Sequence, residues 1–246
     1  MGVHMYLLDG LLVDTGQSHM AKYALAFLEK KTVRKIVLTH HHEDHSGNAA
    51  LISARHRAPV FAHAITAEKM KNRTPICPYQ HIMWGRSTPC TIIPYPATIQ
   101  TERFELTPIH TPGHSRDHTV YLENNRGWLF SGDLFLGEQI KYFRRDEEMI
   151  DQIKSLKRVM GLDFDTLFCA HRPAWKQGKA KIRKKLQFLE GLHGRVEALH
   201  QKGVDVHGIT QSLKTSCDRR ERWFTLGNVS FEHMVRSSIR GLLPLE

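Results

Sequence analysis

THHHEDHSGN, at residues 39–48, is the stretch of this chain that decides its fold. It gathers four histidines and two carboxylates within six positions. A β-rich run at residues 33–38 precedes it and a helical pattern at residues 46–55 follows it, so the stretch is predicted to be a strand-to-helix loop. Such loops, at the carboxyl ends of strands, present ligand groups in open α/β proteins. Because imidazole and carboxylate together suit zinc, iron and manganese, the stretch predicts a metal site.

Three further candidate ligands follow other predicted strands. His114 lies in TPGHS at residues 111–115, where a Pro-Gly pair forces a turn. Asp133 lies in SGDL at residues 131–134, and His171 directly follows a β-rich run at residues 166–170. One histidine cluster alone is moderate evidence, but partners that stand at several strand ends favour a single shared site.

The first 170 residues alternate short strands with helices. Runs of four to eight residues, many of them bounded by Gly, Pro or Asp, are typical of strands and lie at residues 5–8, 11–14, 33–39, 59–63, 104–110, 119–123, 128–131 and 166–170. Apolar residues at helical spacing predict helices at residues 17–30, 46–55 and 147–160. We therefore expect a mixed α/β domain over residues 1–175.

The chain changes character after this domain. Shorter helices are predicted at residues 207–213 and 230–242, the second capped by Asn228 or Ser230. A longer helix begins at Lys179, and one stripe along it is apolar, made of Ile182, Leu186, Leu189, Leu192, Val196 and Leu199. We expect a helical C-terminal region at residues 176–246. Its stripe could dock on the first domain or form a homodimer, and the homodimer is the expectation we prefer.

Residues 72–98 contain five of the ten prolines together with Tyr79, Trp84 and Tyr95. So much proline disfavours a regular helix or a central strand and predicts a long, stiffened loop. One hypothesis is that this loop lines the substrate pocket. The alternative is a loop that only packs on its own domain.

Composition limits the classes of protein. Of 246 residues, 41% are hydrophobic and 24% are charged, and the mean hydropathy is −0.40. These values fit an ordinary soluble protein, and no run approaches the roughly 18 to 20 apolar residues of a membrane helix. The first ten residues do not look like a signal peptide, so a cytoplasmic location is expected. Four cysteines without a C-x-x-C pair fit a reducing compartment and argue against a thiolate zinc site.

The net charge of +10 is unevenly distributed. Residues 172–246 hold 15 lysines and arginines against 7 aspartates and glutamates, a balance of +8. Runs of this kind are usually solvated helix faces, but they can also follow a phosphate backbone. Binding of RNA therefore stays open as an alternative to a small-molecule substrate.

Taken in order, these motifs resemble the metallo-β-lactamase superfamily. The pattern H-x-H-x-D-H, followed by a separate His, Asp and His, is met in full, and the resemblance covers about residues 3–175. It implies a four-layer αββα sandwich with a helical C-terminal appendage. VDTG at residues 13–16 is similar to the family's early Asp motif, which implies that Asp14 supports the site without binding metal. The resemblance also implies two metal ions, the first bound by His40, His42 and His114, the second by Asp44, His45 and His171, with Asp133 between them.

Other residues near the motif take their expected places from the same resemblance. His41 and Glu43 are its spacers and are expected to point away from the metals. His110 and His118 flank His114 and are candidates to orient the ligands by hydrogen bonds, with ordinary surface or core positions as the alternative. The family often has Pro-Gly where this chain has Arg116-Asp117, so the turn there is expected to differ.

The resemblance further implies a metal-dependent hydrolase. Two zinc ions per chain are expected, with iron or manganese as alternatives, and a hydroxide bound by the metals is the expected nucleophile. Asp44 is expected to hold that hydroxide or to pass a proton. The expected substrate is a small molecule with an ester, thioester or lactone bond. Leu136 stands where lactonases of the family typically carry tyrosine, which weakens a strict lactonase assignment.

Three alternatives remain. SGDLFLGE at residues 131–138 and the basic helical tail are similar to the lactamase-like endoribonucleases, which would make the protein a phosphodiesterase acting on RNA. The same ligand types bind iron, so a mononuclear-iron enzyme similar to persulfide dioxygenases is the second alternative. The third is a non-enzymatic binding protein, against which the complete ligand set argues. Fold and ligands together do not select the substrate.

Overall fold

Two five-stranded sheets form the centre of the protein. The computed structural model describes residues 2–72 and 75–242. The first sheet consists of β1 (Tyr6–Leu8), β2 (Leu11–Val13), β3 (Lys35–Val37), β4 (Val60–Ala62) and β5 (Ile92–Pro94), in that spatial order. The second sheet has the spatial order β11 (Thr166–Cys169), β9 (Trp128–Gly132), β8 (Thr119–Glu123), β7 (Glu105–His110) and β6 (Ile99–Gln100).

Strand direction in the first sheet brings several loops to one edge. β1 and β2 are antiparallel and are joined by Asp9 and Gly10, whose φ angles of 48° and 81° suit a two-residue hairpin. From β2 to β5 all neighbours run parallel. The carboxyl ends of β2, β3 and β4 therefore lie side by side. In the second sheet β6 to β9 are antiparallel, and β11 joins β9 in parallel.

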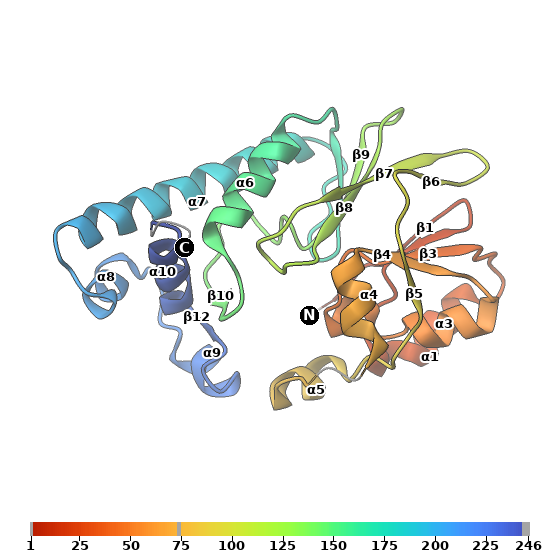
Figure 1. Cartoon of the computed structure of the whole chain (residues 1–246), viewed down its shortest axis with the longest axis horizontal. Helices are drawn as coiled ribbons and strands as arrows, with labels where there is room; N and C mark the ends of the chain where they lie inside the picture. Colours follow the sequence, from red (N-terminus) through yellow and green to blue (C-terminus); the bar gives the residue numbers. More distant parts are fainter. Residues whose placement is uncertain (1, 73–74, 243–246) are drawn as a thin grey trace.

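Helices cover the outer face of each sheet, as Figure 1 shows. The first sheet packs against α1 (Ala21–Leu28), α3 (Ala49–His56) and α4 (Ala64–Lys71). The second packs against α6 (Met149–Met160) and α7 (Gly178–Gln201), and α8 (Val206–Leu213) and α10 (Phe231–Arg240) pack on these helices. A third core, which includes Val13, Val37, Tyr121 and Phe130, fills the space between the sheets. The predicted four-layer αββα sandwich with C-terminal helices is confirmed.

The structure sharpens several predicted boundaries. The helix expected at residues 17–30 starts as a 3-10 turn, Ser18–Met20, before α1. The helix expected at residues 46–55 is two helices, α2 (Glu43–Ser46) and α3, divided at Gly47. A Cβ atom at Gly47 would lie 2.5 Å from two backbone atoms, so only glycine fits there. Ser230, not Asn228, caps α10 by accepting the His233 N–H, and residues 243–246 lie outside the described residues.

The prediction of an irregular loop over residues 72–98 is wrong. This segment contains α5 (Pro78–Trp84) and strand β5. Pro78 stands in the first turn of its helix, where the missing N–H has no intrahelical partner to lose. Pro94 ends an edge strand, which also tolerates proline. Residues 73 and 74 of the predicted loop lie outside the described residues.

The C-terminal helices share one core with the second sheet. The buried residues of the predicted stripe are Ile182, Leu189, Leu192 and Val196, and they pack with α6 and α10 inside the chain. A small two-stranded sheet, β10 (Phe143–Arg144) and β12 (Val229–Ser230), also ties this region to the centre of the chain. Helix α9 (Arg219–Phe224) precedes β12 in the chain. The stripe is thus used within the chain, while the domain boundary at residue 175 and the homodimer stay predictions.

One lysine of α7 reaches back into the second sheet's loops. Lys185 is fully buried, and its Nζ donates a hydrogen bond of 2.6 Å to the Leu134 carbonyl. Burial lowers the pKa of Lys185 to about 8. Leu134 directly follows Asp133, so α7 helps to hold the segment that carries a candidate ligand.

Helix hydropathy gives a separate result. None of the helices in the described part of the chain is both long enough and apolar enough to cross a bilayer.

Candidate metal centre

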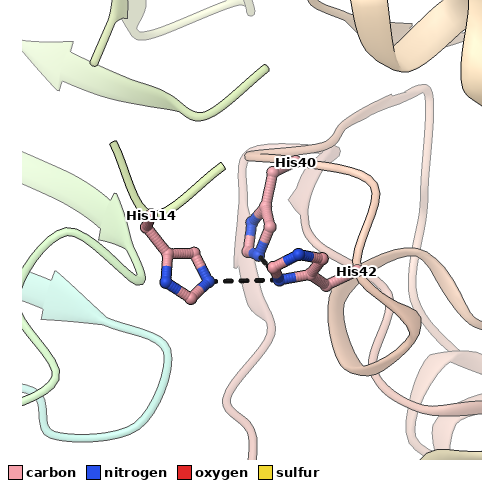
Figure 2. A group of neighbouring side chains, drawn as sticks. All are labelled: His40, His42 and His114. Atoms are coloured by element: carbon pink, nitrogen blue, oxygen red, sulfur yellow. Dashed lines mark hydrogen bonds between the residues drawn. The ribbon is translucent and has the colours of Figure 1, made fainter. Parts of the chain in front are cut away.

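Three of the predicted ligands form a first group at the edge between the two sheets. His40 and His42 lie on the loop that follows β3, and His114 lies in the turn that follows β7. Figure 2 shows their rings converging. The Nε2 atoms of His40 and His114 lie 2.9 and 3.1 Å from the Nδ1 atom of His42. All three side chains are buried.

Four residues form a second group beside the first. Asp44 and His45 lie on α2, Asp133 follows β9, and His171 follows β11. His171 Nε2 lies 3.4 Å from Asp44 Oδ2 and 3.2 Å from Asp133 Oδ1. His45 Nε2 lies 3.7 and 3.3 Å from the same two oxygens. The structure therefore brings all seven predicted ligands together, in two groups with the predicted membership.

Asp133 faces both groups. Its Oδ1 atom points to His45 and His171 of the second group, whereas its Oδ2 atom lies 3.4 Å from His114 Nε2 of the first. The preceding residue explains this position. Gly132 has a φ of 46°, and a Cβ atom there would lie 2.8 Å from His118 Nε2 and from Thr39. Glycine thus lets the end of β9 pass close enough for one carboxylate to reach both groups.

Hydrogen bonds from outside the groups fix the orientation of the rings. Asp14 Oδ2 lies 2.8 Å from His45 Nδ1 and accepts from the Thr39 hydroxyl over 2.9 Å. Thr39 Oγ1 in turn lies 3.0 Å from His40 Nδ1. His171 Nδ1 donates to the Gly2 carbonyl over 3.0 Å. In each case one ring nitrogen is held from behind, so that Nε2 faces the cluster, as oriented metal ligands require.

Glu147 lies behind His114 at ion-pair distance, without a hydrogen bond to it, and sequence reasoning missed it. Its Oε2 atom lies 3.4 Å from His114 Nδ1 and accepts from the Gln152 amide over 2.8 Å. The carboxylate is buried. The only signal in the sequence was an acidic residue at the start of a predicted helix, which equally fits a favourable interaction with the helix dipole. Gly113 permits the approach, because a Cβ atom there would lie 2.4 Å from the Gln152 backbone nitrogen.

Protonation differs between the groups. Burial lowers the pKa of His40 and of His42 well below the usual range, so both are neutral near pH 7. Burial alone would also lower the pKa of His45 and of His171, but the carboxylates of Asp133 and Asp44 raise both, that of His171 to about 10. Burial would raise the pKa of Asp133, but the His45 and His171 rings hold it well below its usual range.

The donor set fits divalent metal ions. Zn–N bonds of about 2.0–2.1 Å in tetrahedral geometry place ligand atoms about 3.3 Å apart, and the contacts within the two groups span 2.9 to 3.7 Å. Two buried atoms that face the second group, His45 Nε2 and Asp133 Oδ1, have no hydrogen-bond partner in the described ranges 2–72 and 75–242. Buried polar atoms normally have a partner, and an ion here would supply it.

Comparison with known proteins agrees with this geometry. Residues 2–171 match the family model described as the metallo-beta-lactamase superfamily, which is more than half of the chain. The chain belongs to the metallo-beta-lactamase superfamily. The two groups have the composition that the superfamily motif predicts for two metal positions. The binding of metal by each residue stays a prediction.

Individual relatives within the superfamily cover different shares of the chain. The Beta-lactamase-like protein 2 homolog of Drosophila melanogaster is 30% identical over 195 residues, which are 74% of this chain and 62% of that protein. The hydroxyacylglutathione hydrolase of Bdellovibrio bacteriovorus is 31% identical over 144 residues, 58% of this chain and 50% of that protein. The chain thus spans about half to three-fifths of the length of these two relatives.

Solved structures of the superfamily share the fold. A metallo-beta-lactamase family protein from Thermus thermophilus superposes with a TM-score of 0.67 over 97% of this chain and 89% of that chain. Its sequence identity of 23% means that this similarity concerns the fold alone.

The two spacers of the superfamily motif point away from the cluster, as expected. Glu43 Oε2 accepts from the Gln80 amide of α5 over 3.0 Å. His41 Nδ1 lies 2.9 Å from Asp117 Oδ1. Asp117 is fully buried and also accepts from the His41 backbone N–H and the Thr66 hydroxyl. The expected difference at residues 116–117 is therefore a carboxylate that anchors the motif loop to α4.

The two flanking histidines have different positions. His118 accepts the backbone N–H of Asp133 over 3.1 Å, and burial lowers its pKa to about 3, so it is a neutral acceptor behind a candidate ligand. His110 instead stacks on His63 with ring centres 4.2 Å apart, and its Nε2 donates to the Arg116 carbonyl. Of the two candidates, only His118 lies against the metal centre.

Proposed function

We propose that the protein is a hydrolase that binds two divalent ions, zinc by preference, and cleaves an ester, thioester or lactone bond in a small substrate. The observation that carries the proposal is the position of Asp133, whose two oxygens face two separate ligand groups. A single ion would use only one of them. The name hydroxyacylglutathione hydrolase, carried by several relatives, supports cleavage at an acyl group.

Zinc is proposed because the donors are imidazole and carboxylate in tight, roughly tetrahedral sets. All four cysteines are free, and none contributes to either group. When bound, the two ions would supply an activated water at neutral pH and withdraw electrons from the scissile carbonyl. The protein's own contribution is to hold imidazole lone pairs in place in the first group, where burial keeps His40 and His42 free of protons.

Asp44 is the residue proposed to handle the proton. Its Oδ2 atom lies 3.4 Å from His171 Nε2, and its side chain is 9% exposed, so it belongs to the cluster and keeps a small contact with solvent. A carboxylate here can take up the proton that the attacking water releases and return it to the leaving group. No other carboxylate of the second group is free for this, because Asp133 faces two groups at once.

Residues 75–98 are proposed to form one wall of the substrate pocket. An open cavity of about 400 Å³ is lined on one side by this segment, including Cys77 and Gln80, and on the other by Arg144 and Asn228. Tyr79, in the same segment, accepts a hydrogen bond of 2.8 Å from Asn228. If the wall binds substrate, Tyr79→Phe and Trp84→Ala should lower kcat/KM. Unchanged catalytic efficiency in both variants would remove the segment from the pocket.

The first test combines metal analysis with a substrate panel. Elemental analysis should find about two zinc ions per chain, and a panel of small ester, thioester, lactone and RNA substrates should show turnover of a small substrate. Asp133→Ala should abolish that turnover, whereas Asp163→Ala, at an exposed aspartate outside the cluster, should not. One iron ion without hydrolysis would move the protein to an oxidative reaction, and cleavage of RNA alone would favour the endoribonuclease alternative.

The remaining proposals concern the whole chain. We propose a cytoplasmic enzyme in which residues 1–175 carry the ligands and residues 176–246 support them, with a homodimer in solution. The free state of all four cysteines supports a reducing compartment. Light scattering of the purified protein would test the dimer, because a monomer mass would end that part of the proposal.

A further inference from the structure

Arg144 ends strand β10 directly beside the metal centre. Its backbone N–H donates to Glu147 Oε1 over 3.0 Å, and the other oxygen of Glu147 faces His114. After burial, the positive charge of Arg144 is the largest cause of the lowered pKa of His42. The guanidinium therefore lies within electrostatic reach of the first ligand group.

The Arg144 side chain is largely buried, and one of its donors is unsatisfied. Its side chain is 18% exposed, and its Nε atom has no hydrogen-bond partner among the residues that the structure describes. One carboxylate is close, since Asp146 Oδ1 lies 3.4 Å from Nε, but Asp146 is 54% exposed and the contact is not a hydrogen bond. A buried charged donor without an acceptor is costly, so a ligand that supplies the acceptor would be bound favourably.

The open cavity of about 400 Å³ gives such a ligand access to Arg144. Its walls come from two separate parts of the chain, residues 75–80 on one side and residues 144–146 with Asn228 on the other. Gln80 links the α5 wall to the metal-ligand loop, because its amide donates to Glu43. A molecule in this cavity would therefore contact Arg144, which is connected to His114 through Glu147, and Gln80, which is connected to the metal-ligand loop through Glu43.

We infer that Arg144 binds an anionic group of the substrate, a carboxylate or a phosphate, while the metal centre holds the bond to be cleaved. The inference rests on the proposed hydrolase function and narrows it to anionic substrates. The planar guanidinium matches the paired oxygens of both anions, which a lysine in its place could not do. The neighbouring Arg145, which also lines the cavity, adds positive charge at its mouth. Asp146 is the group that the anion would displace from Nε.

Paired substrates test the inference in the metal-loaded protein. The pair is 4-nitrophenyl acetate, which is neutral, and mono-4-nitrophenyl succinate, which carries a carboxylate. Arg144→Gln should raise KM for the succinate ester at least about tenfold more than for the acetate, with kcat less affected, and Arg144→Lys should restore part of the difference. An equal effect on both esters would overturn the inference.

A binding measurement separates the inference from the proposed function. Calorimetric titration of succinate and of inorganic phosphate, each into the metal-loaded protein, should give at least about tenfold weaker binding in Arg144→Gln for one of the two anions, which names the source of the charge. Asp133→Ala, which tests the hydrolase, should keep the binding that depends on Arg144. Anion binding lost in Asp133→Ala but kept in Arg144→Gln would mean that the anions bind the metals alone, and would overturn the inference.

Asp146 provides the matched control. If Arg144 binds an anion, Asp146→Asn removes a competitor, and binding should be unchanged or tighter. If Arg144 serves only to pair with Asp146, then Asp146→Asn should weaken binding as much as Arg144→Gln does, and the inference fails. Because this variant leaves Arg144 in place, it also decides the question if Arg144→Gln lowers the melting temperature.

Discussion

The two groups of candidate ligands face one shared carboxylate, Asp133, yet they hold protons in opposite ways. The first group consists of buried imidazoles, and burial keeps His40 and His42 neutral. The second group contains two carboxylates, which raise the pKa of His45 and His171. Without ions, the second group can neutralise itself with protons, whereas the first group consists of imidazole rings that lie within hydrogen-bond distance of one another. The rings of the first group are thus already free of extra protons, whereas the rings of the second group carry protons that the nearby carboxylates stabilise.

This difference gives the two groups opposite links between pH and folding. For His40 and His42 the folded-state pKa is lowered, so the unfolded chain binds more protons and their contribution to stability is lost as pH falls through about 6.5. For His171 the folded-state pKa is raised to about 10, so its contribution is present below about pH 6.5 and is lost as pH rises through 10. The metal-free protein should therefore be weakened at both ends of the pH range.

The largest effect should come from removing the charge that both groups share. Asp133→Asn keeps the shape of the side chain but removes the bridging carboxylate, so we expect metal content to fall below two ions per chain. Activity should fall on the order of 1000-fold, equivalent to ~4 kcal/mol in the barrier. Elemental analysis and steady-state kinetics would measure both, with Asp163→Asn as the control. Full metal content in Asp133→Asn would show that the groups bind independently of the bridge.

Glu147→Gln should separate the groups. His114 is the candidate ligand that Glu147 contacts, so the loss of Glu147 should weaken one metal position by about 10- to 100-fold and leave the other unchanged. Competition with a chromophoric chelator would resolve the two affinities. The matched variant is Asp14→Asn, which acts on His45 directly and on His40 through Thr39. It should weaken both positions, and an equal pattern in the two variants would contradict the division into groups.

A smaller effect is expected at the anchor of the loop that both groups share. Burial would raise the pKa of Asp117, but the hydrogen bond and charge of the His41 ring, the charge of Lys69 and the hydrogen bond from Thr66 hold it well below its usual range. Asp117→Asn should lower the free energy of unfolding by about 1.5 kcal/mol at pH 7. Because a lowered carboxyl pKa stabilises only above about pH 4, the difference should shrink as pH falls further. Urea unfolding at pH 7 and pH 3.5 would show whether it does.

The smallest signal is a count of protons. At pH 7 His171 is protonated in the metal-free protein, because its pKa is about 10, and it must lose that proton to bind an ion. Metal binding at the second group should therefore release about one proton or more, and binding at the first group close to none. Calorimetry in buffers of different ionisation enthalpy would count them. Equal proton release in both binding steps would contradict the proposed difference in protonation between the first and the second group.

The sequence predicted what depends on local pattern. Strand β8 has the predicted bounds, Thr119–Glu123, and the seven candidate ligands could be named because each one stands in or beside a short motif at the end of a strand. The split of the ligands into two groups came from the family resemblance. The candidate ligands could be predicted because the end of a strand fixes the positions of the residues that follow it.

Other features depend on contacts between distant segments, which local pattern does not report. Glu147, Arg144 and Lys185 all contact the metal centre or its loops across 33 to 51 residues of chain or through a second residue. In the sequence alone, each of these three residues could equally be a charged residue on the surface. The helix α5 was missed for another reason, since proline was taken as a helix breaker although Pro78 stands at the helix start.

Lys185 has a consequence for anyone who wishes to engineer this protein. The superfamily match ends at residue 171, but the ammonium group that holds the Leu134 carbonyl comes from a helix beyond it. A shortened version that stops at residue 175 would leave that carbonyl and the apolar face of α6 in water. We therefore expect residues 1–175 not to fold stably when they are moved into another protein without α7. Chimeras should exchange these residues together with α7, because the two parts share one hydrophobic core.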